Sequence, residues 1–397
     1  MKALMLFLTL FLLCSTQLFS NEKDSSLDGY ISKYKKELFS YDYEKNEAES
    51  SKLRDSWIAP LRLDYSYTKR GEDATLREYQ NAGIKMDQPI FASGGIIYGI
   101  KFADASKLYA DYSIDVAKRK MIKDAVSILM QIKQTSLKEK KQHYQIQNSK
   151  INLLQKKEEY LNGQLDSGFL NNAVIQRNIV VQGLYDIQSS KEKLISRFEA
   201  LSDMSYKDAS IPHLELLTSE EFLKNNIVLK MTQSEILKNR YKKDVTVAQY
   251  LPRVNLTAGY TWDKAVDERD YYNYGFKVSI PLDINTFRDI ESVRVDYLKS
   301  QVVKKDKQRE LDALFEQVMH NIKNFDKKMA LSDENIELYD ELLKETQELY
   351  EAGYKTKYDV DTLKNSLEIQ KIDLKIYEID KQLELLTLYE MYVNDGK

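Results

Sequence analysis

Two stretches without glycine or proline limit what this 397-residue chain can fold into. Residues 100–162 and 282–352 contain neither residue type. Because glycine and proline are the residues that most disfavour a helix interior, each stretch predicts one uninterrupted helix of about 90 to 105 Å. Helices of this length cannot form a compact globule, so they must pack side by side.

The apolar residues of these helices repeat with alternating spacings of four and three. One such row is Leu311, Phe315, Val318, Ile322, Phe325 and Met329, and another is Ile372, Ile376, Ile379, Leu383 and Leu386. This spacing is the heptad seam of coiled-coil packing. The residues between the seams are mostly charged or polar, which is typical of solvent-facing helix positions.

The prolines indicate an internal duplication. Pro60 and Pro89 are 29 residues apart, as are Pro252 and Pro281, and the second pair follows the first by 192 residues. Three nearby residues recur at the same offset: Asn81, Gly83 and Lys85 become Asn273, Gly275 and Lys277. We therefore predict one structural unit used twice.

The segments between the paired prolines have a period of two instead of a helical period. Apolar and polar residues alternate over 61–68, 254–262 and 272–280. Such alternation predicts strands with one apolar face, and the polar stretches 69–78 and 263–270 are expected to connect them. Each unit therefore contains a β-hairpin, at about 57–91 and about 251–282.

Two features favour strands in a membrane over an ordinary half-buried sheet. Tyrosine and tryptophan gather near the loops, as in the aromatic girdles of outer-membrane barrels, and the strands have the about 9 to 11 residues that a tilted strand needs to cross a bilayer. Four strands cannot close a barrel, and open sheet edges do not occur in lipid, so several chains must share one. We expect Leu256, Tyr260, Trp262, Tyr274, Phe276 and Val278 to face lipid, with Val278 near mid-strand. We expect Lys85, Asn255, Thr257 and Lys277 to face the lumen.

The chain begins like an exported protein. A lysine, the apolar run 4–13 and the small residue Ser20 predict a signal peptide over 1–20, too short for a spanning helix of about 20 apolar residues; the alternative is a buried N-terminal helix. Cys14, the only cysteine, lies within it, so the mature chain would have no disulfide or thiolate site.

The predicted organisation is two repeats joined by a linker. The first repeat, 21–203, holds an N-terminal helix, the first hairpin and long helices over about 97–203. The linker covers 204–225. The second repeat, 226–397, holds a helix, the second hairpin and long helices over about 286–393.

Enzymatic and nucleic-acid functions are disfavoured. The net charge is -3 without a basic stripe, which argues against nucleic-acid binding. The three histidines, His143, His213 and His320, lack the spacing of metal ligands. We therefore predict no enzyme activity, no catalytic residue, no cofactor and no metal site.

Three motifs in order carry a resemblance to a known family. Tyr350, Gly353, Thr356, Asp359 and Val360 fit a tyrosine, glycine, Ser/Thr and Asp-Val pattern at a helical hairpin turn. The first repeat has a weaker copy in Gly168 and Asn171, with Val174 where an aspartate is often found, and Leu251-Pro252 precedes an alternating strand. Over essentially the whole mature chain, the sequence resembles the TolC family of outer-membrane channels.

The resemblance implies a mainly α-helical fold with β-structure. Three chains would share a 12-stranded transmembrane β-barrel and a long coiled-coil helical barrel that crosses the periplasm. It implies a homotrimer in the outer membrane that passively conducts substrates delivered by a periplasmic adaptor and an inner-membrane transporter. A periplasmic coiled-coil scaffold without a pore is the alternative. The exported substrate, whether drug, metal or protein, stays open.

The helical turns far from the membrane are the candidate gate. Glycine at the turns 163–172 and 351–357 supplies the left-handed conformation that ends a helix, and Thr356 is expected to cap the next helix. Asp359 would support that helix start or, with Asp361, form a threefold carboxylate ring that attracts cations. Lys355 stands where the family often has a basic residue that ties the closed tip. The predicted tip residues are Gly353, Lys355, Thr356, Asp359, Asp361, Gly168 and Asn171.

Overall fold

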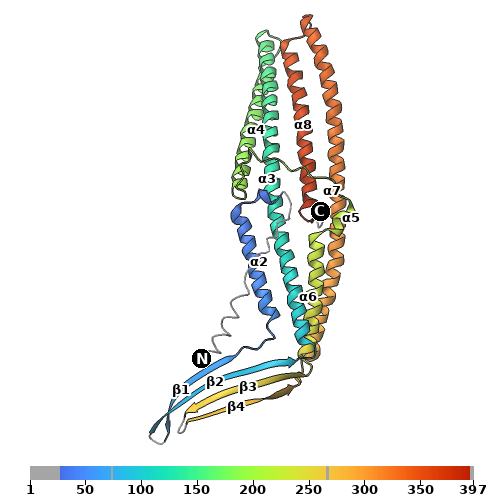
Figure 1. The fold of residues 1–397 in the computed structure, drawn as a ribbon. Helices are drawn as coiled ribbons and strands as arrows, with labels where there is room; N and C mark the ends of the chain where they lie inside the picture. The colour runs from blue at the N-terminus through green and yellow to red at the C-terminus, as the bar shows by residue number, and fades with distance from the viewer. Residues whose placement is uncertain (1–26, 73–74, 265–267, 394–397) are drawn as a thin grey trace.

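The computed structural model of the chain describes residues 27–72, 75–264 and 268–393, so the predicted signal peptide and Cys14 lie outside the described residues. The molecule is elongated, with one antiparallel sheet at one end and long helices along the rest (Figure 1). The prediction of a mainly α-helical fold with β-structure is confirmed. None of the helices in these ranges combines the length and the apolar character needed to cross a membrane.

One arrangement of elements occurs twice along the chain: a helix, two strands and two longer helices. A short η1 (Asp28–Tyr30) precedes the first set, and a short α5 (Ser219–Lys224) precedes the second. The first set is α2 (Lys33–Arg54), β1 (Arg62–Glu72), β2 (Thr75–Phe91), α3 (Gly95–Leu161) and α4 (Ser167–Glu199). The second set is α6 (Ile227–Gln249), β3 (Arg253–Lys264), β4 (Glu268–Ser279), α7 (Thr286–Glu351) and α8 (Lys357–Tyr389).

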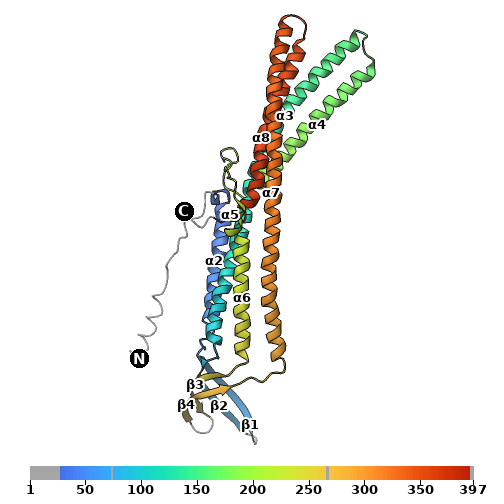
Figure 2. The ribbon, with the colours of Figure 1, turned by 90° about the vertical axis from the view of Figure 1, so that its right-hand side faces the viewer.

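Two helices run the length of the helical part. α3 has 67 residues and α7 has 66, about 100 Å each. The helices α2 and α6 lie beside their sheet-side halves, whereas α4 and α8 fold back along their far halves (Figure 1). Near the sheet the contacts run α2 to α3, α3 to α6 and α6 to α7. Figure 2 shows the α3–α4 hairpin leaning away from the α7–α8 hairpin at the far end.

The hydrophobic core lies at mid-height, where the two sets of elements meet. The Phe222 ring of α5 stacks on Phe315 of α7 with 5.8 Å between ring centroids, and Phe198 is fully buried beside them. Four residues of the predicted seam on α7 are buried there: Leu311, Phe315, Val318 and Ile322. The irregular segment 200–218 crosses this level, where the Leu214 N–H donates to Gln382 Oε1 at 2.8 Å.

The sheet is antiparallel with the strand order β1-β2-β3-β4. Its strands extend into the polar stretches expected to be connections, because β1 continues to Glu72 and β3 to Lys264. The charged residues fit strand ends because they pair across the ladder, as Lys69 and Glu78 do at 2.9 Å. The register between β2 and β3 shifts near Pro89, where a bulge accommodates the missing N–H.

Candidate functional site: sheet faces and helical tips

The register divides the residues of the sheet into two faces. Cross-strand partners lie on the same face of a sheet, and successive residues lie on opposite faces. Leu256 pairs with Phe276 and Val254 with Val278, whereas Asn255 pairs with Lys277. All six residues predicted to face lipid therefore share one face, which we call the apolar face: Leu256, Tyr260, Trp262, Tyr274, Phe276 and Val278. The four predicted lumen residues, Lys85, Asn255, Thr257 and Lys277, share the other, the polar face.

The apolar face is exposed in the single chain. Tyr274 has 81% of its surface exposed and Phe276 73%. Across β1 and β2 the same face continues through Leu63, Tyr65 and Ile84. A continuous apolar face of this kind marks a surface that is covered by lipid or by another protein.

The charged groups of the apolar face lie at the loop end. Tyr260 donates to Asp270 at 3.1 Å, and the Trp262 indole donates to Glu268 at 2.8 Å. Aromatic rings with their polar atoms directed to such groups are typical of the boundary between lipid and water. Val278, expected near mid-strand, is instead the next-to-last residue of β4, and Ala258 paired with Tyr274 marks the middle.

The far turn of the second repeat has the predicted geometry. Gly353 ends α7 with φ +82°, and the Tyr354 N–H donates to the Leu349 carbonyl at 2.8 Å, which is the Schellman pattern. Thr356 caps α8: the Asp359 N–H donates to the Thr356 hydroxyl, and the Thr356 N–H donates to the Asp359 carboxylate at 2.9 Å.

These contacts favour the helix-start role of Asp359. Its hydrogen bonds with Thr356, helped by the charge of Lys355, lower the pKa of the Asp359 carboxyl, because they stabilise the ionised form. Lys355 is exposed at the turn, and Asp361 lies half-buried in the first turns of α8. The carboxylate ring of Asp359 and Asp361 stays a prediction.

In the turn of the first repeat, Gly168 does not take the place of Gly353, although the sequence motif had indicated that it would. The glycine with positive φ is Gly163, at +73°, and its Schellman bond runs from the Gln164 N–H to the Glu159 carbonyl at 2.9 Å. Asp166 caps α4 by accepting from the Gly168 N–H at 2.6 Å. Gly168 and Asn171 are thus ordinary helical residues of α4, and Gly163 and Asp166 are the counterparts of Gly353 and Thr356.

A row of polar contacts that the sequence did not indicate joins α3 to α8. Lys141 forms an ion pair with Asp373 at 2.7 Å, Asn365 donates to Asn148 at 2.8 Å, and Tyr358 donates to Glu158 at 3.3 Å. The partners are 200 or more residues apart in sequence, so no local pattern could pair them. This α3–α8 polar row extends from mid-height to the tip and links the two hairpins directly.

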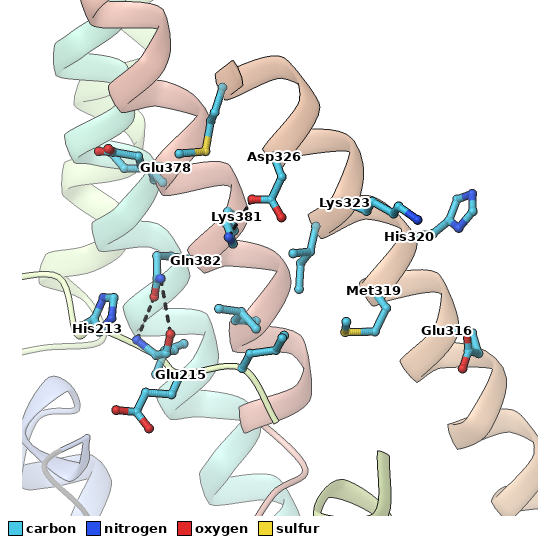
Figure 3. A pocket seen from close by; sticks show the side chains of 16 residues that line it. His213, Glu215, Glu316, Met319, His320, Lys323, Asp326, Glu378, Lys381 and Gln382 are labelled. Atoms are coloured by element: carbon cyan, nitrogen blue, oxygen red, sulfur yellow. Dashed lines mark hydrogen bonds and ion pairs between the residues drawn. The ribbon is translucent and has the colours of Figure 1, made fainter. Parts of the chain in front are cut away.

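A groove of about 1030 Å³ lies at mid-height between α7, α8 and the segment 213–216. In Figure 3, His320 points outward from α7, while His213 lies on the other side of α8. An ion pair of 2.7 Å between Lys381 and Asp326 spans the groove. All three histidines of the chain are exposed, and no group of three acidic, histidine or cysteine side chains suited to a metal occurs among the described residues.

Comparison with known proteins shows a family match for part of the chain and a shared fold for most of it. Residues 218–392 match the family described as outer membrane efflux protein. The fold is similar to the outer membrane protein VceC of Vibrio cholerae, with 14% identity over 90% of this chain and 93% of that chain and a TM-score of 0.72. It is also similar to the CmeC outer membrane channel of Campylobacter jejuni, with 12% identity, 94% and 86% coverage and a TM-score of 0.71. No curated protein sequence matches the chain.

The open state of the Neisseria gonorrhoeae MtrE outer membrane channel has the same fold, with 10% identity, 92% and 87% coverage and a TM-score of 0.64. Residues 218–392 match this family, and the fold of the chain is similar to that of outer-membrane channels, so the predicted resemblance to the TolC family is confirmed. The expected location in the outer membrane, with an extension into the periplasm, is confirmed by the match of residues 218–392 to this family.

Proposed function

We propose that three copies of this chain form a channel through the outer membrane, which continues as a helical tunnel into the periplasm. The observation that carries the proposal is the amphipathic sheet with two open edges. Within the described chain, β1 and β4 each pair on one side only, and the apolar face is bare. Open edges are not tolerated in lipid, and three four-stranded sheets can close a 12-stranded barrel in which every edge is paired.

The helical part supports the same assembly. Its outermost helices near the sheet, α2 and α7, carry exposed apolar residues at helical spacing. On α2 these are Tyr34, Leu38 and Tyr41, and on α7 they are Val295, Leu298 and Val302. Packing α2 of one chain against α7 of the next would bury both rows and close a ring of helices.

Substrate passage through this channel would be passive, and energy would come from partner proteins. We infer a periplasmic adaptor and an inner-membrane transporter as partners because the resemblance to the TolC family implies them. The tip with Gly353, Lys355 and Thr356 would be the gate, and the α3–α8 polar row would hold the two hairpins together in the closed form.

The mass of the protein in detergent and its conductance in planar bilayers test the proposal. We expect a trimer and discrete single-channel steps. The alternative, a periplasmic coiled-coil scaffold without a pore, explains the helices but not the apolar face. A monomer with intact β-signal, or a trimer that never conducts, would favour the scaffold.

A further inference from the structure

Basic side chains gather on the polar face of the sheet, in the half nearest the helices. Lys85 on β2 lies directly opposite Arg62 on β1. On β4, Lys277 lies opposite Asn255, and Arg253 begins β3 on the same face. We call Arg62, Lys85, Arg253 and Lys277 the basic belt.

The carboxylates of the chain do not neutralise this belt. Only Asp64 and Asp87 lie on the same half of this face, and Asp87 accepts a hydrogen bond from Asn255 at 2.6 Å. Within the described residues, Arg62, Lys85 and Lys277 form no hydrogen bond or ion pair, and Arg253 donates to the Gln249 carbonyl. Four cations against two carboxylates leave an excess of two positive charges per chain.

The charged groups of the apolar face are placed differently from those of the basic belt. Its charged groups lie at the loop end, where Lys69 is paired with Glu78 at 2.9 Å. Like charges directly opposite each other destabilise a sheet, and the Arg62–Lys85 pair carries such a cost, since neither side chain forms an ion pair within the described residues. The charges of the basic belt cost stability and face open space. This placement indicates that mobile anions supply the counter-charge.

We propose that the basic belt is an anion filter inside the barrel, so that the channel favours anionic solutes such as organic carboxylates and phosphates. This inference rests on the proposed trimeric channel. Three chains would carry six excess positive charges around one lumen, at the level where the barrel meets the helical tunnel. Rings of arginine and lysine select anions in other pores, and a charged cleft raises the local concentration of counter-ions by about 10-fold or more.

The test is the reversal potential of single channels in planar bilayers under a potassium chloride gradient. We expect the wild-type channel to pass chloride in preference to potassium. The double variant Lys85→Gln/Lys277→Gln should lower the chloride-to-potassium permeability ratio by about twofold or more. The matched control, Lys264→Gln, removes a lysine of the apolar face at the loop end and should leave the ratio unchanged.

Three further measurements test the inference, and the first two do not require the glutamine variant to assemble. The variant Lys85→Arg/Lys277→Arg keeps the charges and should keep the selectivity. In the wild type, raising the salt from 0.1 M to 1 M shortens the screening length from about 10 Å to about 3 Å and should weaken the anion preference. Inorganic tripolyphosphate should block the chloride current of the wild type more strongly than that of the glutamine variant.

The outcomes separate the two proposals. A wild-type protein that never conducts would overturn the channel itself. A conducting channel that prefers potassium, or whose permeability ratio is the same in the wild type and the glutamine variant, would overturn the anion filter and leave the channel standing.

Discussion

Arginine substitutions at two neighbouring residues of β3 test which face of the sheet meets lipid. Ala258 is on the apolar face, paired with Met86 on one side and Tyr274 on the other, in the middle of the sheet. Thr257 is on the polar face at nearly the same depth, opposite Asp87. Because the two residues are adjacent, the substitutions share strand, depth and added side chain, and they differ in the face and in the side chain that is removed.

The expected costs differ severalfold. Arginine on the lipid face of a barrel costs about 2 to 4 kcal/mol at the bilayer midplane, so Ala258→Arg should destabilise each chain by that amount. Thr257→Arg loses the hydrogen bond from the Thr257 hydroxyl to the Gly275 carbonyl, 3.1 Å long, which is worth about 0.5 to 1.5 kcal/mol. The nearby Asp87 carboxylate should offset part of that loss.

Equilibrium unfolding by guanidinium of the protein folded into phospholipid vesicles measures both costs. We expect the Ala258→Arg midpoint to fall well below that of Thr257→Arg, or the variant to fail to assemble while Thr257→Arg assembles. Equal costs would mean that the two faces do not separate lipid from lumen. A larger cost at Thr257 would mean that the faces are reversed.

Three predictions concern the helical tip. Gly353→Ala should cost about 1 to 2 kcal/mol in thermal unfolding because φ is +82° there, and Gly353→Asn should cost less. The pKa of the Asp359 carboxyl is lowered in the folded state, so the carboxylate stabilises the fold at pH values above its ordinary pKa. This stabilisation is lost as the pH falls through the lower pKa of the folded state. Asp359→Ala should abolish this pH dependence and weaken amide-exchange protection in the first turn of α8. Tyr358→Phe combined with Asn148→Ala should raise the open fraction in single-channel recordings, whereas Tyr354→Phe, at an exposed side chain of the same tip, should not.

The sequence predicted those features that depend on local spacing. The period of two assigned the two sheet faces residue by residue, and the heptad spacing identified the buried seam from Leu311 to Ile322. The Gly353–Thr356 turn was predicted because a single glycine there precedes a capping threonine. The strands are longer than predicted. The charged stretch 69–78 resembles a loop in the sequence, and only the cross-strand pairing shows how far the strands continue into it.

Choices between equivalent local signals, and contacts between distant helices, could not be predicted from the sequence. Gly163 and Gly168 are both available to end α3, and only the hydrogen bonds of the turn show that Gly163 does so. The α3–α8 polar row depends on the relative register of two helices, which neither helix encodes alone. The Lys141–Asp373 pair, for example, joins residues 232 positions apart.

The distribution of buried residues indicates which part of the molecule can change state. The large core side chains, such as Phe198, Phe222 and Leu388, lie at mid-height, and strand pairing fixes the opposite end. Beyond the core toward the tip, buried positions include small or polar residues such as Ala173 and Thr346, with a few apolar ones such as Leu367 and Ile372. Leu→Ala or Phe→Ala in a core costs about 2 to 5 kcal/mol, whereas one exposed ion pair or neutral hydrogen bond is worth about 1 kcal/mol. The contacts between the hairpins can therefore break and reform while the core stays packed, so substitutions in the core should alter stability and those in the α3–α8 polar row should alter opening.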